Sequence, residues 1–277
     1  MIPIKSSNIS SIYGPVDSWR LGKSLGVDLL MAPSTCSFNC TYCQLGFIQR
    51  ITTERKVYVP TKKVISDFKA SNWQDADVIT FSGSGEPTLA KNIGEVIREI
   101  KKITSGEIPI VILTNGTLFN DEGVLGDILD ADVISVKLDA PDDETLQAIN
   151  RPAIGINLDL LIKGIKCLKK DISLINVGAY CNKPLLQIQI MFMPQNKNKT
   201  EELAKLLNEI RPDEVALNTP TRPYPSGFDI ITRGAHGEDV KKIKHPTKPL
   251  KQLTREEAEE IENRLREMTG LKIISVY

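Results

Sequence analysis

Short apolar runs alternate with amphipathic segments along most of the chain. The apolar runs are rich in β-branched residues and apolar on successive positions, as in parallel strands that are buried on both faces. They are Gly26 to Met31, Val78 to Phe81, Pro109 to Leu113, Val133 to Leu138, Leu186 to Met193 and Glu214 to Leu217. The segments with a helical period are Lys62 to Ala70, Asn92 to Ile103, Asp121 to Leu129, Asp143 to Ile149, Leu158 to Lys169 and Thr200 to Ile210. The pattern therefore predicts six β/α units.

This alternation is typical of an α/β fold whose parallel sheet has right-handed crossovers and here closes partly into a barrel. We expect ligand chemistry at the carboxyl ends of the strands. Residues 219 to 249 break the pattern and are rich in proline, which predicts a long irregular segment. A helix follows it, with a capping box at Thr254 and Glu257 and a stop at Gly270, and then a short strand at Lys272 to Tyr277. We therefore divide the chain into a core with its N-terminal lead-in, residues 1–223, and a C-terminal extension packed on the core, residues 224–277.

Composition and charge narrow the class of protein. With 41% hydrophobic and 25% charged residues, the chain of 277 residues has the balance of a globular protein, not of a disordered or fibrous one. Its 35 basic and 35 acidic residues cancel, so any nucleic-acid-binding patch must be local. Residues 233–251 hold such an excess: Arg233, Lys241, Lys242, Lys244, Lys248 and Lys251 against Glu238 and Asp239. Since no signal-peptide core or membrane-spanning run occurs, we expect a cytoplasmic protein without a membrane partner.

Three of the five cysteines, Cys36, Cys40 and Cys43, lie within eight positions. In a reducing compartment this crowding indicates metal binding rather than disulfides. A structural zinc ion takes four protein ligands, and the remaining cysteines, Cys167 and Cys181, are single and distant. An iron–sulfur cluster of the [4Fe–4S] type usually takes four thiolates, so three would leave one iron open for a small molecule. Spacing alone leaves both kinds of site open.

The spacing CxxxCxxC, with Tyr42 before the third cysteine, resembles the signature of the radical S-adenosylmethionine (SAM) superfamily. SGSGEPT at residues 82–88 resembles the glycine-rich turn that follows the second strand in that family. TNG at 114–116 and KLDA at 137–140 end the third and fourth strands, at the same rim as the cysteine loop. The resemblance implies a partial (β/α)6 radical SAM barrel. It also implies a [4Fe–4S] cluster that would cleave SAM reductively to a 5′-deoxyadenosyl radical, which would take a hydrogen atom from the substrate.

The resemblance also implies roles for single residues. The cysteines Cys36, Cys40 and Cys43 are the expected iron ligands. The residues expected around SAM are the turn residues Gly83, Gly85 and Glu86 near the methionyl amine, Lys137 or Asp139 at the ribose or carboxylate, Tyr42 near the adenine, and Asn115 on the same rim. Cys167 and Cys181 are expected to be buried small hydrophobes.

Within the superfamily, the likeness to the 4-demethylwyosine synthases, which act on tRNA, covers residues 13–223. It rests on GEPTLAKNIGEVI and KLDAPDDETLQAINRP. Two departures stand against it: no cysteine precedes Cys36 to hold a second cluster, and Gln44, Leu45 and Gly46 stand where those enzymes have Trp-Arg. The likeness implies modification of a tRNA base and a reductant such as flavodoxin or ferredoxin. The compact size also suits a peptide-modifying or glycyl-radical-activating enzyme. A non-enzymatic iron–sulfur or zinc module leaves SGSGEPT and KLDA unexplained.

Overall fold

A curled sheet of eight strands forms the centre of the computed structural model, which describes residues 9–175, 183–235 and 237–276. The strand order is β1-β2-β5-β6-β7-β8-β9-β12. Six consecutive members of this order are parallel: β2 (Gly22–Val27), β5 (Val78–Phe81), β6 (Ile110–Thr114), β7 (Val133–Lys137), β8 (Leu185–Met191) and β9 (Glu214–Asn218). These strands confirm the predicted partial barrel.

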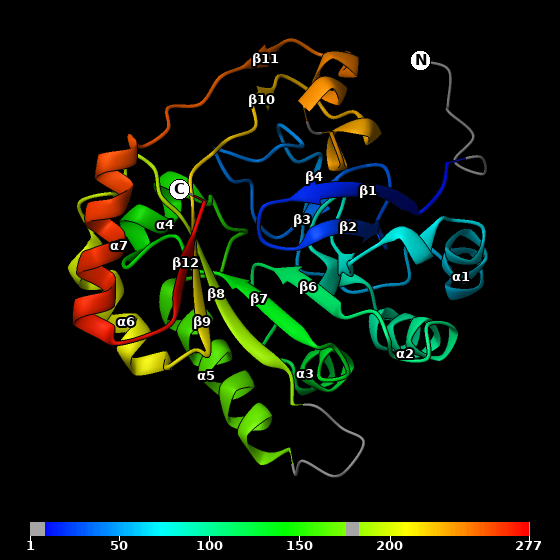
Figure 1. Ribbon diagram of the computed structural model, residues 1–277, viewed down its shortest axis with the longest axis horizontal. Coiled ribbons are helices and arrows are strands. Elements are labelled where there is room, and N and C mark those ends of the chain that lie inside the picture. The colour runs from blue at the N-terminus through cyan, green and yellow to red at the C-terminus, as the bar shows by residue number, and fades with distance from the viewer. Residues whose placement is uncertain (1–8, 176–182, 236, 277) are drawn as a thin grey trace.

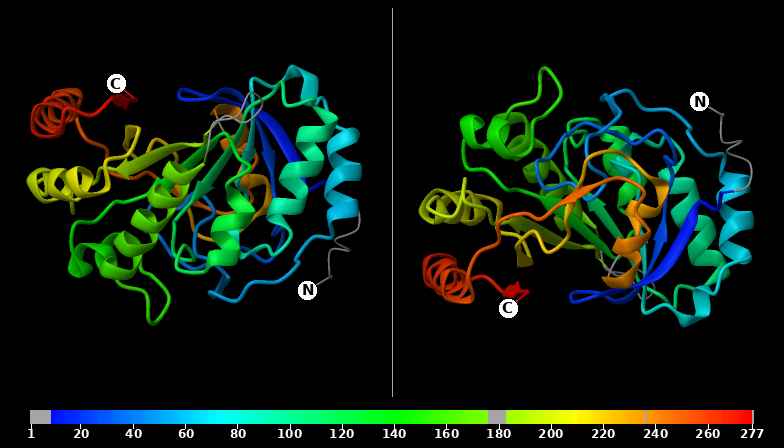
Figure 2. Two further views of the ribbon diagram at one scale, coloured as in Figure 1. Left: turned by 90° about the horizontal axis from the view of Figure 1, so that it is seen from below. Right: turned by 90° about the horizontal axis from the view of Figure 1, so that it is seen from above.

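Helices cover the outside of the curled sheet (Figures 1 and 2). They are α1 (Thr61–Lys69), α2 (Ile93–Ile103), α3 (Glu122–Ile128), α4 (Asp143–Ile149), α5 (Leu158–Leu174) and α6 (Thr200–Ile210). In α2 the apolar stripe of Ile93, Val96, Ile97 and Ile100 is fully buried. Its period of 3.6 residues places these side chains on the face that packs on the sheet. All six helices were predicted, with bounds that differ mainly at the end of α5.

The N-terminal edge of the sheet differs from the prediction. Strand β1 (Ile12–Ser18) pairs antiparallel with β2, although Gly14, Pro15 and Asp17 interrupt its apolar pattern. Strand β2 begins at Gly22 and ends at Val27, so the predicted strand from Gly26 was placed too late. The apolar residues Leu29, Leu30 and Met31 are buried in the loop after β2 instead. The apolar run therefore predicted correctly that these residues are buried, but the strand end predicted from it was wrong.

At the other edge, β12 (Ile273–Ser275) lies parallel to β9. It follows α7 (Arg255–Thr269), which begins with the predicted capping box at Thr254 and Glu257 and ends at Gly270 in the left-handed conformation. Helix α7 packs on α6, and β12 extends the main sheet, so the last part of the extension is continuous with the core. The division at residue 223 stays a prediction.

Between β9 and α7 the chain arches over the open side of the sheet (Figure 1). It contains the short strands β10 (Tyr224–Pro225) and β11 (Thr247–Lys248), which pair with each other, and two 3-10 turns at Ile230–Arg233 and Gly237–Lys242. We call residues 219–254 the C-terminal strap. Cys181 and His236 lie outside the described residues. Within the described ranges, no helix combines the length and the apolar composition needed to cross a bilayer.

Candidate active site

The three clustered cysteines lie on the loop that follows β2, at the carboxyl ends of the strands. Cys36 ends the short strand β3 (Thr35–Cys36), which pairs with β4 (Arg50–Ile51). Cys40 and Cys43 follow in a turn, in which Cys43 N–H donates a hydrogen bond of 3.1 Å to the Cys40 carbonyl. All three thiols are half-buried, and all three line one cavity of about 330 Å³. The predicted iron ligands are therefore brought to one wall of one cavity.

Backbone hydrogen bonds anchor this cysteine loop to both of its neighbours. On one side, Thr35 N–H donates to the Ser84 carbonyl (2.8 Å), and the Thr35 carbonyl accepts from Glu86 N–H (3.1 Å). On the other side, Asn39 N–H donates to the Asn150 carbonyl (2.9 Å), and Thr41 N–H donates to the Ile149 carbonyl (2.8 Å). The turn after β5 and the end of α4 thus hold the loop in place.

Gly85 is required by this anchoring. Its φ of +151° is one that residues with a side chain rarely adopt, and a Cβ built on it would lie 1.6 Å from the Thr35 carbonyl oxygen. The sequence argument assigned the glycine to close approach of a ligand, whereas the close approach in the structure is to the cysteine loop. Gly83 and Gly85 also line the cavity, so their contact with SAM stays a prediction.

Glu86 is almost fully buried, with 2% of its surface exposed. One carboxylate oxygen accepts hydrogen bonds from Thr88 N–H (3.1 Å), Thr88 Oγ1 (2.7 Å) and Thr114 Oγ1 (2.7 Å), and the other accepts from Asn115 N–H (2.7 Å). Burial raises the pKa of this carboxyl, and the hydrogen bonds oppose that shift. Glu86 is not among the residues that line the cavity. Its contacts join the turn after β5 to the end of β6, and its predicted contact with the methionyl amine stays a prediction.

Two asparagine amides point at the cysteine sulfurs. Asn115 Nδ2 lies 3.6 Å from Cys36 Sγ and donates to Ser37 Oγ at 2.8 Å, and Asn150 Nδ2 lies 3.4 Å from Cys40 Sγ. Sequence reasoning placed Asn115 on this rim but missed Asn150, although INRP belonged to the motif that carried the family likeness. Amide donors at sulfur are a known means of tuning an iron–sulfur cluster.

The thiols of the loop suit a cationic group. Burial raises the pKa of Cys36 well above its usual range, that of Cys40 to about 11 and that of Cys43 to about 12. Thiolates at these positions therefore need the positive charge of iron. Among the described residues, no three thiol, imidazole or carboxyl groups converge as the ligands of a single ion do. In a [4Fe–4S] cluster each thiolate binds its own iron atom, and the three cysteines on one wall of the cavity fit a cluster that keeps one iron open for a small molecule.

The predicted residues Tyr42, Lys137 and Asp139 meet beside Cys40. The buried Asp139 carboxylate accepts from Tyr42 Oη, from Asn150 Nδ2 (2.7 Å) and from Met191 N–H (2.7 Å). Lys137 Nζ lies 3.0 Å from Asp139 Oδ1 and 5.0 Å from the centre of the Tyr42 ring. The buried ammonium of Lys137 has no further hydrogen-bond partner among the described residues, which fits a donor to a ligand's carboxylate or ribose. Only Tyr42 of the three lines the cavity.

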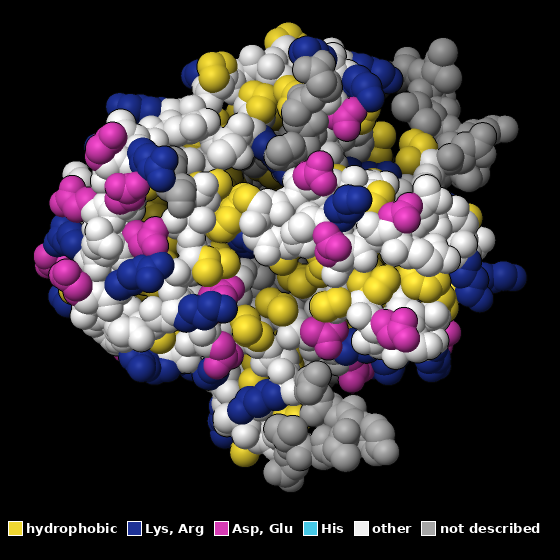
Figure 3. Space-filling model, viewed as in Figure 1, with side chains coloured by type: hydrophobic (Ala, Val, Ile, Leu, Met, Phe, Trp, Pro, Cys, Tyr) yellow, Lys and Arg dark blue, Asp and Glu magenta, His cyan; other side chains and the backbone are white. Residues whose placement is uncertain are grey.

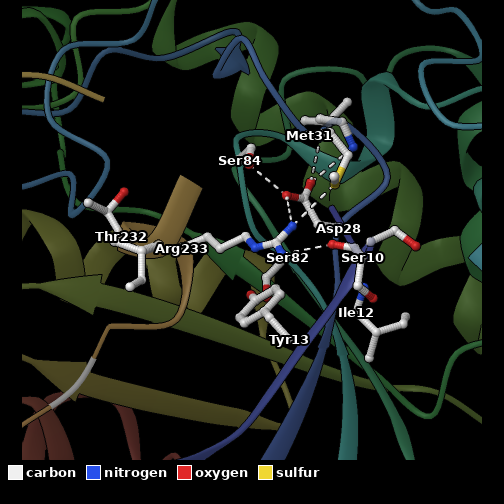
Figure 4. Close-up of polar contacts among 12 residues, drawn as sticks. Ser10, Ile12, Tyr13, Asp28, Met31, Ser82, Ser84, Thr232 and Arg233 are labelled. Atoms are coloured by element: carbon white, nitrogen blue, oxygen red, sulfur yellow. Dashed lines mark hydrogen bonds and ion pairs between the residues drawn. The ribbon is translucent and has the colours of Figure 1, made fainter. Parts of the chain in front are cut away.

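Sequence reasoning missed a second polar cluster, which joins the C-terminal strap to the barrel (Figure 4). Asp28 is fully buried after β2 and accepts from Leu30 N–H and Met31 N–H, both at 3.0 Å, and from Ser84 Oγ at 2.6 Å. Arg233 Nη1 lies 3.1 Å from the same carboxylate. Its guanidinium also lies 4.9 Å from the centre of the Tyr13 ring. An aspartate inside the apolar run GVDLL was the available signal, because a buried carboxylate requires a partner.

Relatives and solved structures agree with this geometry. The sequence pattern described as "Radical SAM superfamily" matches residues 33–207, which include all three cysteines. A UPF0026 protein of Synechocystis is 43% identical over 232 residues, or 83% of each chain, and one of Methanocaldococcus jannaschii is 32% identical over 80% of this chain and 68% of its own.

Two solved structures share the fold at low sequence identity. Streptococcus suis SuiB bound to its precursor peptide SuiA has a TM-score of 0.58 at 13% identity. The match covers 90% of this chain and 48% of SuiB. Archaeal TYW1 has a TM-score of 0.54 at 14% identity, with 91% of this chain and 74% of that one covered. The chain therefore belongs to the radical SAM superfamily, whose members are enzymes that use a [4Fe–4S] cluster and SAM.

Proposed function

We propose that this chain generates a 5′-deoxyadenosyl radical from SAM and uses it to modify a base in tRNA. The observation that carries the radical step is the shared cavity, which the three cysteines line together with Gly83, Gly85 and Tyr42. The bound cluster and SAM supply a one-electron cleavage of the sulfur–carbon bond, with the electron from a reductant such as flavodoxin or ferredoxin. The protein contributes a rigid loop, amide donors at two sulfurs and an enclosed barrel interior.

Support for an RNA substrate comes from the C-terminal strap. Lys244, Lys248 and Lys251 are exposed on it, and Lys and Arg side chains lie at intervals along the upper rim of the molecule, with hydrophobic side chains between them (Figure 3). The rim lies beside the open side of the barrel, where a substrate must enter (Figure 1). Because the whole chain is neutral, this rim is where the phosphate backbone of an RNA is most favourably bound.

The radical step is tested by anaerobic reconstitution. We expect about four irons and four sulfides per chain, because three thiolates hold one cubane cluster. Dithionite and SAM should then yield 5′-deoxyadenosine even without substrate, and Cys36→Ala, Cys40→Ala or Cys43→Ala should abolish both cluster and product. Cys167→Ala is the matched control, since Cys167 lies in α5 and does not line the cavity. SAM cleavage that survives the loss of a clustered cysteine would contradict the assignment.

The RNA step is tested by the salt dependence of tRNA binding. Each phosphate that a lysine neutralises contributes about −0.7 to −0.9 to the slope of log affinity against log salt concentration. Changing Lys244, Lys248 and Lys251 together to alanine should flatten this slope by about 2 to 3 units. The control triple variant changes Lys62 and Lys69 of α1 and Lys91 in the turn before α2, all of which are exposed. Equal slopes in the two triple variants would favour the alternative substrate class, a peptide or a glycyl-radical partner.

A further inference from the structure

The interior of the barrel carries positive charge without matching negative charge. The 330 Å³ cavity beside the cysteines continues into a smaller one of about 100 Å³, and both are lined by Arg20, Arg222 and Arg233. Neither cavity has an aspartate or glutamate among its lining residues. Apart from the three cysteines that would hold the cluster, the charged side chains that line the two cavities are guanidiniums, which suit an anion.

Only one of the three arginines has its charge neutralised by the protein. Arg233 pairs with Asp28, as described above. Arg20, in the turn between β1 and β2, donates a hydrogen bond of 3.2 Å to Gln187 Oε1, which is uncharged. Arg222, four residues after the end of β9, likewise donates to an uncharged acceptor, the amide oxygen of Gln44. Within the described ranges, neither Arg20 nor Arg222 forms an ion pair.

Glu214 is the carboxylate that raises the pKa of Arg20, and it already has other partners. Glu214 is bound by Gln187 Nε2 at 2.7 Å and by Lys272 Nζ at 2.6 Å. Burial lowers the pKa of Arg20 to about 10, with the nearby Arg222 guanidinium adding to the shift, and burial also lowers the pKa of Arg222. Two desolvated guanidiniums close to each other are costly to hold, so an anion between them stabilises the site.

The two arginines reach below the rim where the cysteines lie. Gln187, which accepts from Arg20, is near the start of β8, and Met191 at the strand end contacts Asp139. Four residues of strand span about 13 Å, so Arg20 reaches the floor of the barrel while the cysteine loop is at the opposite end. Arg222 contacts Gln44, the residue after Cys43, and so bridges the two levels.

We infer that Arg20 and Arg222 bind a phosphate group of the substrate inside the barrel, beneath the cysteine loop. The inference rests on the proposed function and narrows its substrate to a nucleotide that brings a phosphate into the cavity. Two unpaired guanidiniums match the two negative charges of a phosphate monoester, or two phosphodiesters that flank one nucleotide, whereas a single carboxylate leaves one guanidinium unpaired. The planar fork of arginine also fits phosphate oxygens in pairs. The nucleotide is either part of an RNA or free.

Inorganic phosphate is the first probe. Its binding to the reconstituted protein is measured by calorimetry in the presence of saturating SAM. We expect a single site that Arg20→Gln and Arg222→Gln each weaken at least tenfold, while Arg20→Lys retains part of the affinity because it keeps the charge and loses the fork. Arg98→Gln is the matched control, since Arg98 is an exposed residue of α2 that pairs with Asp130 outside the barrel. Circular dichroism of each variant verifies that it is folded.

Three results would overturn the inference: no phosphate binding, equal phosphate binding in the arginine variants and in the control, or competition between phosphate and SAM for one site. Stronger binding of acetate than of phosphate would also overturn it, in favour of a carboxylate. Displacement of phosphate by adenosine 5′-monophosphate indicates a free nucleotide, and displacement by an RNA hairpin alone indicates an RNA. Failure of SAM cleavage contradicts the proposed function instead, because phosphate binding needs no radical step.

Discussion

At the scale of single residues, the turn after β5 serves the cysteine loop as much as any ligand. The Thr35 carbonyl oxygen approaches Gly85 so closely that a Cβ would have no room, and the Glu86 carboxylate accepts hydrogen bonds from protein donors on both of its oxygens. A buried carboxylate with four hydrogen bonds is a structural anchor in its own right. The sequence GEPT is therefore compatible with two roles, holding the cysteine loop and contacting a ligand, and the motif alone does not distinguish them.

Gly85→Ala should damage the cysteine loop before it affects SAM. The added methyl group overlaps the Thr35 carbonyl oxygen, and the backbone at φ +151° is strained for alanine, so we expect a loss of roughly 2 to 4 kcal/mol in unfolding free energy. Iron content after reconstitution should fall together with stability. Gly126→Ala is the matched control, because nothing lies within 4 Å of its Cβ position in α3. A variant that keeps full iron but binds SAM weakly would show that Gly85 serves the ligand alone.

Asn115 should raise the reduction potential of the bound cluster. Its amide lies 3.6 Å from Cys36 Sγ, and a donor at sulfur stabilises the more negative, reduced cluster. One such hydrogen bond is worth about 1 kcal/mol, which corresponds to about 40 mV for one electron. Asn115→Ala should lower the midpoint potential by that order in a redox titration followed by electron paramagnetic resonance. Asn120→Ala, at an exposed position distant from the sulfurs, should leave the potential unchanged.

How much of the site the sequence reveals depends on how far apart its residues lie along the chain. The cysteines, the SGSGEPT turn, Asn115 and the Lys137–Asp139 pair each follow a predicted strand, so their meeting at one rim follows from the parallel topology. Asp28 and Arg233 are 205 positions apart, and Arg20 and Arg222 are almost as distant. Their meeting depends on where an irregular segment crosses the barrel, which no local pattern encodes.

At the scale of elements, the period of hydrophobic positions predicted every main helix and the central strands. This pattern was wrong at segments whose place in the fold does not match their local amino-acid composition. Strand β1 contains a glycine, a proline and an aspartate, and it exists because β2 offers an edge for antiparallel pairing. The run after Gly26 was read as strand to Met31 because burial in a loop and burial in a strand produce the same apolar pattern.

The C-terminal strap contains only short regular elements in its described residues, and Arg233 fixes it to the barrel. Arg233→Met should destabilise the protein by roughly 3 kcal/mol, because the buried Asp28 carboxylate loses its charged partner. Urea unfolding measures the loss, and trypsin should cleave the strap faster in the native state. The double variant Asp28→Asn/Arg233→Met should recover part of the stability, since no buried charge remains unpaired. Unfolding and cleavage equal to those of the parent protein would show that the strap is held elsewhere.

At the scale of the whole molecule, a neutral total charge hides an uneven distribution. The two cavities inside the barrel are lined by arginines without aspartate or glutamate, and exposed lysines lie on the strap that arches over the open side. Acidic side chains gather elsewhere, as over α7 in Figure 3. An approaching anion thus meets positive charge first at the rim and then inside the barrel, which favours entry from that side.

The backbone hydrogen bonds that hold the cysteine loop from two sides have a consequence for the loss of its cluster in air. Hydrogen bonds to Ser84 on one side and to Asn150 and Ile149 on the other come from backbone groups, which do not depend on iron. We therefore expect the loop to keep its shape when a cluster is lost to oxygen, so that reloading iron and sulfide costs little chain entropy. Repair of the inorganic centre should then need no unfolding of the protein.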